Sequence, residues 1–390
     1  MSPHADAACA PLIVHLIHQL ETGGVENGLV NLINNLPPDR YRHAIVCMKD
    51  HSDFSRRIRR PGVEIISINK REGKDWAHYF RLFRTLRRLQ PLLIHTRNLS
   101  SLEGQLLAAA AGVRLRVHGE HGRDMKDLYG RKLRYRLLRK LLRPLIGHFI
   151  AVSSDLEAWL VGTIGARPQR VTHIRNGVDS VHFHPRLGPP AAVGPTGFLG
   201  EDSFVIGSVG RMVEVKDYMS LVHAFLLLLA EDDMAQEQMR LMIIGDGPCR
   251  HACLDLLHQA GVSHLAWLPG NRDDISQLMR TMDVFALPSL AEGTSNTILE
   301  AMATGLPVVA TDVGGNADVV QSGWTGTLVP ARNAELLADA IGAYYRIPGL
   351  GAHHGVHGRR RVLAEFSLMA MADAYLAVYD RLTQLPPMKG

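Results

Sequence analysis

Short apolar runs alternate with longer amphipathic stretches along the whole 390-residue chain. The runs begin at Leu12, His43, Val63, Leu92, Arg114, His148, Arg170, Phe204, Arg240, Leu265, Asp283, Pro307 and Gly326. Near-continuous apolar runs are typical of parallel strands that are buried on both faces, and helical periodicity between them indicates crossover helices. The pattern therefore predicts an α/β protein with two doubly wound parallel sheets.

The length of 390 residues favours two domains, at about 100–200 residues per domain. The composition, with 46 % hydrophobic and 21 % charged residues, is that of an ordinary globular protein. The stretch around residues 184–203 is rich in Pro and Gly and has neither strand nor helix periodicity, so we expect a linker there. This gives an N-terminal domain at 1–183 and a C-terminal domain at 204–365. We expect the last segment, 366–390, to be a helix that packs back toward the N-terminal domain.

Charge divides the chain near residue 190. Residues 1–190 carry 30 Lys+Arg against 16 Asp+Glu, a net charge of +14, and residues 191–390 carry 13 against 22, a net charge of −9. The two halves are therefore expected to face different partners. Nucleic acid is not expected among them, because few aromatic residues lie in the basic clusters and no helix-turn-helix, zinc-finger or RNP-like pattern is present.

One basic segment, residues 131–143, has the periodicity of an amphipathic helix. Leu133, Leu137, Leu138 and Leu141 recur at helical spacing, and arginines and lysines cover much of the remaining surface. The leucines could pack into the core beneath a solvated basic face. Alternatively, the helix could dock on anionic lipid headgroups.

Cysteine usage favours a reducing compartment, because Cys9, Cys47, Cys249 and Cys253 are too scattered for a disulfide framework. The last two, with His251 between them, depart from the C-x2-C spacing of a zinc site, so no metal is expected there. No charged-then-apolar leader opens the chain, and the longest apolar runs fall short of the roughly 18 residues of a membrane-spanning helix. We therefore expect a cytoplasmic protein.

In each half of the chain, one motif follows the first strand-like run. Gly23 and Gly24 precede a helix, where free N–H groups suit a phosphate, although the same turn can simply start a helix. It is neither a G-x-G-x-x-G nor a P-loop, so nicotinamide enzymes and P-loop NTPases are poorly supported. Arg211 and Lys216 follow the run at Phe204, and these two cations could hold a diphosphate or form an ordinary solvated pair.

The segment EGTSNTILE holds the most specific pattern, with seven residues between Glu292 and Glu300. Eight positions make slightly more than two helical turns, so both carboxylates reach one ligand only if Glu292 lies in a loop before the helix. The N–H groups of Thr294, Ser295 and Asn296 at the predicted helix start are suited to phosphate. Solvated glutamates would explain either residue alone, but less easily their placement around this loop.

Together these motifs resemble those of the retaining glycosyltransferases of family four, which have the GT-B fold. The resemblance rests on EGTSNTILE, GGVE at Gly23, NGVD at Asn176, GRMVEVKD at Gly210, GDGP at Gly245 and GLPVVATDVGG at Gly305. It covers nearly the whole chain. The first half, with HTRNLSSLEGQ and RVHGEHGRDMKDLYG, is most similar to the exopolysaccharide sugar transferases associated with exosortase (PEP-CTERM) systems.

The resemblance implies a donor site on the C-terminal domain. Glu300 would bind the ribose hydroxyls of a nucleotide-sugar, and Glu292 would lie against the transferred sugar as a catalytic residue. Arg211 and Lys216 would bind the donor pyrophosphate. Backbone N–H groups would help them, namely those of Gly23, Gly24, Thr294, Ser295 and Asn296.

The resemblance also implies an active-site histidine on the N-terminal, acceptor-side domain, within RVHGEHG. We prefer His121 and keep His118 as the second choice. Retention implies a front-face route with an oxocarbenium-like transition state, in which the leaving phosphate helps to deprotonate the acceptor. The chain has no Asp-x-Asp, so its own cations are expected to hold the diphosphate, and neither a metal nor another cofactor is expected.

We therefore expect an enzyme, peripheral at the inner face of the membrane, that moves a sugar from a nucleotide diphosphate to a lipid-linked or polysaccharide acceptor in exopolysaccharide biosynthesis. Anionic inner-leaflet lipids are a further expected partner. Two alternatives keep the fold. One is a non-catalytic scaffold that binds nucleotide or lipid phosphate in a polysaccharide assembly complex, and the other is a nucleotide-sugar epimerase.

Overall fold

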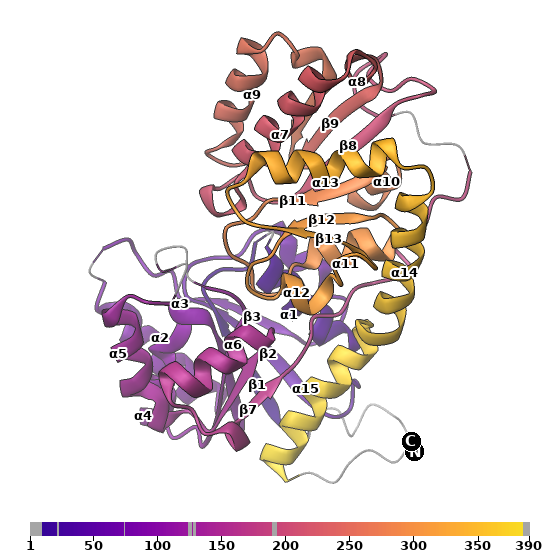
Figure 1. Ribbon diagram of the computed structural model, residues 1–390. Helices are drawn as coiled ribbons and strands as arrows, with labels where there is room; N and C mark the ends of the chain where they lie inside the picture. Colours follow the sequence, from indigo (N-terminus) through magenta and orange to yellow (C-terminus); the bar gives the residue numbers. More distant parts are fainter. Residues whose placement is uncertain are drawn as a thin grey trace. The chain divides into compact units, whose positions relative to one another are not determined.

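A computed structural model describes residues 10–21, 23–73, 75–123, 127, 130–188 and 193–384. Cys9, residues 189–192 of the predicted linker and residues 385–390 of the predicted last helix lie outside the described residues. The chain divides into two compact units (Figure 1). Residues up to Gly177 form the first unit together with those from Leu368, and Val178–Ser367 forms the second.

The first unit is built on a seven-stranded parallel sheet with the order β3-β2-β1-β4-β5-β6-β7. Its strands are β1 (Leu12–Ile17), β2 (Arg42–Cys47), β3 (Glu64–Ser67), β4 (Leu93–Arg97), β5 (Leu115–Glu120), β6 (His148–Ala151) and β7 (Val171–His173). The chain builds outward from β1 on one side and from β4 on the other, so the topology switches between these two neighbours. Each predicted run of the first half contains or overlaps one of these strands.

Helices cover both faces of this sheet because successive strand residues point to opposite sides. Ile13 and Leu93 pack with α1 and α15, whereas Val14 and Ile94 pack with α2 and α4. The helices are α1 (Gly24–Asn35), α2 (Ala77–Leu89), α3 (Asn98–Leu102), α4 (Gly104–Ala110), α5 (Leu133–Leu142), α6 (Ser154–Trp159) and α15 (Leu368–Thr383). Shorter turns are η1 (Asp53–Arg57), η2 (Arg143–Leu145), η3 (Leu160–Ile164) and η4 (Pro168–Arg170).

The second unit repeats this plan with six parallel strands in the order β10-β9-β8-β11-β12-β13. The strands are β8 (Phe204–Val209), β9 (Met239–Ile244), β10 (Ala266–Gly270), β11 (Val284–Leu287), β12 (Val308–Thr311) and β13 (Gly326–Val329). Here the topology switches between β8 and β11. The two sheets confirm the predicted fold class of two doubly wound, Rossmann-like α/β domains.

The helices of the second unit again lie on both faces. One face packs against α7 (Tyr218–Glu231), α9 (Arg250–Gln259) and α13 (Ala334–Arg346), and the other against α10 (Ile275–Met279), α11 (Asn296–Ala303) and α14 (Leu350–Glu365). The remaining elements are α8 (Asp233–Gln238), α12 (Asn316–Val319), η5 (Glu214–Lys216) and η6 (Ser263–Leu265).

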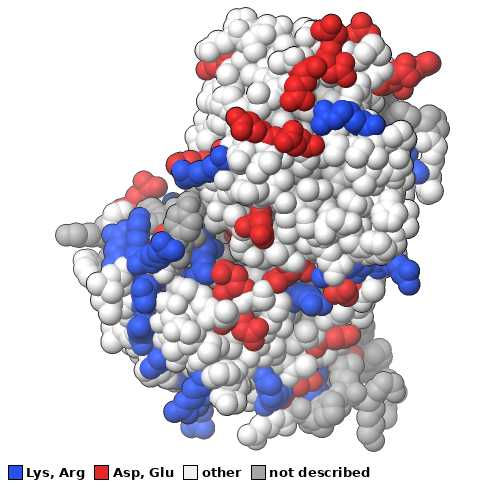
Figure 2. Space-filling view, viewed as in Figure 1, with Lys and Arg blue, Asp and Glu red and all other residues white. Residues whose placement is uncertain are grey.

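The predicted basic helix is α5, and η2 with Pro144 follows it. Leu133, Leu137 and Leu141 are 66 %, 54 % and 74 % exposed, so the core-packed interpretation is wrong for these three leucines. They lie four residues apart and therefore form one apolar stripe. Figure 2 shows Lys and Arg side chains gathered over this part of the first unit. Among the described helices, none combines the length and the apolar character needed to cross a bilayer.

Candidate active site

In the second unit, the loops after β8 and β11 meet where the strand order reverses. The Leu290 N–H donates to the Val215 carbonyl at 2.7 Å and ties the two loops together. Ligands of open α/β sheets bind beyond the carboxyl ends of the strands at such a switch point. The predicted donor residues of the second half lie on these loops and on α11.

Lys216 and Glu292 form an ion pair at this point. Lys216 Nζ donates to Glu292 Oε1 at 2.5 Å, and Ser289 Oγ donates to the same oxygen at 2.6 Å. The two charged side chains are 21 % and 10 % exposed, so water screens the pair less than it screens a surface pair. The sequence motifs indicate neither the contact between Lys216 and Glu292 nor the role of Ser289 as a second partner, although all three residues lie in or beside the quoted motifs.

Two glycines allow the backbones of neighbouring loops to come into direct contact at this site. Gly314 has a φ of +54°, and a Cβ built on it would lie 1.9 Å from the Glu292 carbonyl oxygen. A Cβ on Gly245, at a φ of +135°, would lie 2.0 Å from the Gly210 carbonyl oxygen. Only a residue without a side chain allows such backbone contacts. The glycines of the GDGP and VGG motifs therefore fix where Glu292 and the loop before Arg211 lie.

Helix α11 begins beside Glu292. Ser295 is its N-cap, with Oγ accepting from the Ile298 N–H at 3.4 Å, and Thr294 is buried just before it. Asn296 opens the helix and Glu300, which is half-buried, follows about one turn later. Glu292 thus lies in the loop and Glu300 on the helix, the arrangement that the spacing of the two glutamates requires.

Arg211 follows Gly210 at the carboxyl end of β8 and is exposed. Within the described residues, no carboxylate pairs with its guanidinium, and Lys216 is the second cation on the same loop. The loop therefore presents one free cation and one that is already neutralised by a carboxylate.

In the first unit, the Gly23 and Gly24 turn starts a helix as predicted. Gly23 is the N-cap of α1, and a Cβ built on it would lie 2.2 Å from Glu26 Oε2. The Glu26 carboxylate therefore lies over this turn, where an acidic group is favourable to the helix. A phosphate on these N–H groups would first have to displace Glu26.

His118 and His121 occupy different environments. His118 lies within β5, almost completely buried, with Nδ1 2.7 Å from Thr96 Oγ1 and Nε2 3.3 Å from Glu120 Oε1. His121 follows the strand, and its backbone N–H donates to Asn98 Oδ1 at 2.7 Å. Burial, reinforced by the Arg97 charge, lowers the pKa of His121 to about 3, so its imidazole is neutral near pH 7.

Glu120, between the two histidines, is held by Arg139 of α5. Arg139 donates from Nε at 2.6 Å and from a terminal nitrogen at 3.1 Å to the two carboxylate oxygens. Burial raises the pKa of Glu120, but the Arg139 charge and His118 outweigh it and bring the pKa to about 2. No sequence motif indicates this buried pair, which joins the basic helix to the strand that ends before His121.

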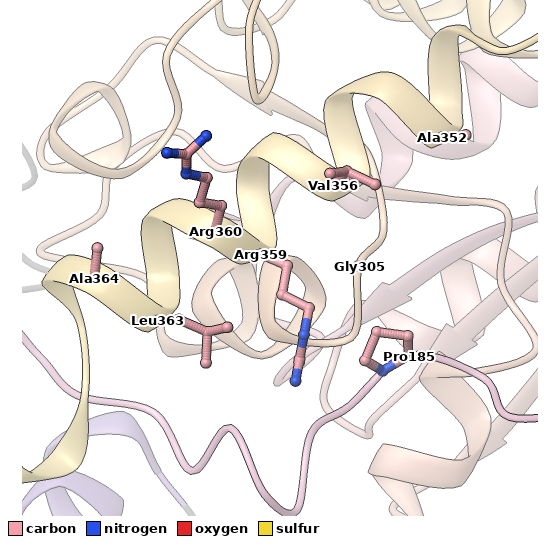
Figure 3. A pocket seen from close by; sticks show the side chains of 9 residues that line it. Pro185, Gly305, Ala352, Val356, Arg359, Arg360, Leu363 and Ala364 are labelled. Carbon is pink, nitrogen blue, oxygen red and sulfur yellow. The ribbon is translucent and has the colours of Figure 1, made fainter.

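A groove of about 740 Å³ lies elsewhere on the second unit (Figure 3). It is lined by α14 together with Pro185 and Gly305, and it shares no residue with the predicted donor site. Apolar side chains such as Leu363 dominate its lining, so its chemistry differs from that of the Lys216 loop.

Cys249, just before α9, and Cys253, within it, form no metal site with neighbouring side chains of the described residues. Cys253 is buried and its Sγ contacts Met219 Sδ at 3.7 Å. Throughout the described ranges, no three His, Cys, Asp or Glu side chains come together in a way that could hold a metal ion.

Comparisons with known proteins agree with the two-sheet architecture, which is that of GT-B glycosyltransferases. Residues 22–181 match the family described as Glycosyltransferase Family 4, and residues 203–346 match the Glycosyl transferases group 1. Each half of the chain therefore matches a family of glycosyltransferases.

Two relatives illustrate the range of the family. A UDP-Gal:alpha-D-GlcNAc-diphosphoundecaprenol alpha-1,3-galactosyltransferase of Escherichia coli is 25 % identical over 82 % of this chain and 84 % of its own. The lipopolysaccharide core biosynthesis mannosyltransferase LpcC of Rhizobium leguminosarum bv. viciae is 33 % identical over 54 % of this chain. That match spans 60 % of the mannosyltransferase, less than two thirds of its length.

Solved structures share the fold at low identity. A glycosyltransferase of Rickettsia africae superposes with a TM-score of 0.78 at 20 % identity, covering 96 % of this chain and all of the other. HepE of Anabaena in complex with UDP-glucose gives a TM-score of 0.76 at 20 % identity, covering 95 % of this chain and all of its own.

Proposed function

We propose that this protein is a retaining hexosyltransferase that moves a sugar from a nucleoside diphosphate to a lipid-linked or polysaccharide acceptor in exopolysaccharide biosynthesis. The observation that carries the proposal is the Lys216 and Glu292 pair at the switch point of the second sheet, beside α11 and Glu300. The names of the relatives support the substrate classes, since one uses UDP-Gal and a diphosphoundecaprenol-linked sugar. The likeness of the first half to exosortase-associated transferases supports the pathway.

The cations of the second unit would stabilise the leaving diphosphate. As the bond from the sugar C1 to the diphosphate breaks, negative charge grows on the phosphate oxygens, and Lys216 and Arg211 would neutralise it. Glu292 holds the Lys216 ammonium in place before the donor arrives. The acceptor oxygen would then bond to C1 on the same face, and its proton would pass to the leaving phosphate. No metal enters this scheme.

His121 would act as a neutral hydrogen-bonding group at the transferred sugar. An imidazole whose pKa is about 3 does not protonate between pH 5 and 8, so it supplies no proton to the leaving group. This assigns proton transfer to the phosphate and orientation of the sugar to His121.

The test is transfer by the purified protein from a panel of nucleotide-sugars to a lipid-linked diphosphate acceptor, in the presence of EDTA. We expect one donor to react with retention of anomeric configuration, and Glu300→Ala or Lys216→Ala to lower activity roughly a hundredfold while folding is preserved. Full activity of both variants would contradict the site. Nucleotide binding without turnover would favour the scaffold, and conversion of the donor without an acceptor would favour the epimerase.

The exposed stripe of α5 supports a peripheral position on an anionic membrane. Leu133, Leu137 and Leu141 project between arginines and lysines, a pattern that lets apolar side chains enter the headgroup region while the cations contact lipid phosphates. On α2, Phe80 is 62 % exposed beneath the Arg84 guanidinium, and Trp76 just before the helix is 74 % exposed. Exposed aromatic rings next to cations are also suited to the headgroup region of a membrane.

Vesicle flotation tests this placement. The protein should bind phosphatidylcholine vesicles only when they contain phosphatidylglycerol, and Leu137→Ser should weaken binding. Leu336→Ser is the matched control, since Leu336 is an exposed helical leucine of the acidic second unit. Equal losses in both variants, or binding that ignores lipid charge, would contradict the proposal.

A further inference from the structure

A buried polar layer lies between the sheet of the first unit and the helices α1 and α15. His15 and His43 meet at 3.0 Å between Nε2 and Nδ1, and Arg97 donates to His15 Nδ1 at 3.1 Å. Tyr379 of α15 lies 2.8 Å from His95 Nδ1. All five side chains are 2 % exposed or less. The mechanism proposed above uses none of them.

Arg97 fixes the direction of one hydrogen bond in this layer, because a guanidinium can only donate. His15 must therefore accept at Nδ1. Between the Tyr379 hydroxyl and His95 Nδ1, the phenol is the better donor and a neutral imidazole nitrogen is the better acceptor, so the phenol proton is directed at His95 Nδ1. His95 then carries its own proton on Nε2.

The Nε2 atoms of His95 and His121 point into one small space above Gly119. A Cβ built on Gly119 would lie 2.9 Å from His95 Nε2 and 2.7 Å from His121 Nε2. Both nitrogens are buried, and neither has a hydrogen-bond partner among the described residues. The protonated Nε2 of His95 therefore faces His121 Nε2 across a gap that a small ring movement would close.

We infer that His95, oriented by Tyr379 of the C-terminal helix, is a positioning residue that fixes the tautomer of His121. His95 offers an N–H at Nε2, so His121 turns the lone pair of its Nε2 toward it and keeps its own proton on Nδ1. The inference rests on the proposed role of His121. It adds that α15, although last in the chain, helps to set the hydrogen-bonding group presented to the sugar.

Burial supports this assignment by keeping the histidines neutral. The pKa values of His95 and His121 are both lowered, first by burial and then by the Arg97 charge, so each ring has a single proton to place. A tautomer is therefore the only protonation choice left to His121 near pH 7.

Nitrogen-15 NMR of histidine-labelled protein tests the inference without an activity assay. The His121 and His95 signals are assigned with His121→Gln and His95→Gln. We expect His121 to carry its proton on Nδ1 in the parent protein, and Tyr379→Phe to produce a mixture of tautomers. Tyr375→Phe is the matched control. Tyr375 lies on the same helix as Tyr379, and its ring centre is 6.0 Å from that of His95. No hydrogen bond of its hydroxyl is found in the described part of the chain. His121 protonated on Nε2 in the parent protein would overturn the inference.

Kinetics provide the second test. Tyr379→Phe should lower kcat about tenfold, the effect of one hydrogen bond, while the donor KM and the melting temperature stay nearly unchanged. In a His121→Ala background, Tyr379→Phe should cause no further loss. An equal loss in both backgrounds would show that Tyr379 acts through another route and would overturn the inference. Full activity of His121→Ala would instead remove the proposed role of His121, leaving the NMR result to stand separately.

Discussion

The two units share a fold but place their polar groups differently. In the second unit, the strands are apolar except for a few residues such as Arg240, and the charged groups of the candidate site lie on loops beyond the strands, as Lys216 and Glu292 do. In the first unit, the strands themselves carry buried histidines, and His15 and His95 pair across neighbouring strands. A loop site can be changed without touching the core. The site of the first unit is continuous with its core, so its chemistry and its stability are coupled.

Lowering the pH should produce the largest difference between the two units, because it should destabilise the first unit more than the second. Among the described residues, six histidines of the first unit have lowered pKa values, including His43 and His121 at about 3, against two in the second unit. Below pH 6.5 the unfolded chain binds protons that the folded unit excludes, so stability falls as pH falls. Between pH 6.5 and pH 5, His43 and His121 should each lower the free energy of unfolding by about 2 kcal/mol.

Hydrogen exchange measured by mass spectrometry checks this prediction once intrinsic rates are corrected for pH. Peptides from β1, β4 and β5 should lose protection at pH 5, and peptides from β8 and β11 should keep it. Equal loss of protection in both sheets would contradict the predicted difference in acid stability between the two units.

Removing the Lys216 cation of the second unit should give the next largest effect. Lys216→Ala deletes the ammonium and leaves Glu292 unpaired, so we expect kcat for sugar transfer to fall roughly a hundredfold. Arg346→Ala, which breaks an exposed ion pair with Glu231 in the same unit, is the control and should change kcat little. Steady-state kinetics of the two variants decide the matter, and similar values would contradict the assignment of Lys216.

A glycine pair tests whether the loops of the second unit are held by backbone contact. Gly314→Ala would force a Cβ against the Glu292 carbonyl, and we expect a destabilisation of about 2 kcal/mol together with reduced transfer. Gly323→Ala is the control. Its φ of +79° is also left-handed, but open space surrounds it, so only the conformational cost of about 1 kcal/mol should appear. Urea unfolding should rank the two variants in this order, and the reverse order would contradict the account.

Helix caps offer the finest comparison. Ser295 caps α11 in the second unit and Ser153 caps α6 in the first. Substitution of either by alanine should cost about 1 kcal/mol of stability. Only Ser295→Ala should also weaken nucleotide binding, measured by calorimetry, because α11 begins beside the proposed diphosphate site. Weakened binding in Ser153→Ala as well would mean that the effect is general.

The sequence predicted the second unit more fully than the first. Apolar runs identified the strands, and the spacing of Glu292 and Glu300 correctly required a loop followed by a helix, since both patterns depend on local periodicity. The ion pair of Lys216 with Glu292 could not be predicted, because it requires the strand order that makes β8 and β11 neighbours.

The buried layer of the first unit was beyond local patterns. His15 and His95 each lie within an apolar run, which was the only available signal, and a single histidine in a strand is usually an isolated core residue. Tyr379, the partner of His95, lies 284 positions away in the chain. Only the return of α15 to the first unit brings the two together.

Nucleotide binding tests the central claim most directly, namely that the protein's own cations on the second unit hold a donor diphosphate. UDP, GDP and ADP are titrated calorimetrically into the parent protein and into Lys216→Ala, each in EDTA. We predict that one nucleotide binds the parent protein and that Lys216→Ala weakens this binding at least tenfold, by about 1.4 kcal/mol. Binding that disappears in EDTA, or that is unchanged in Lys216→Ala, would contradict the account.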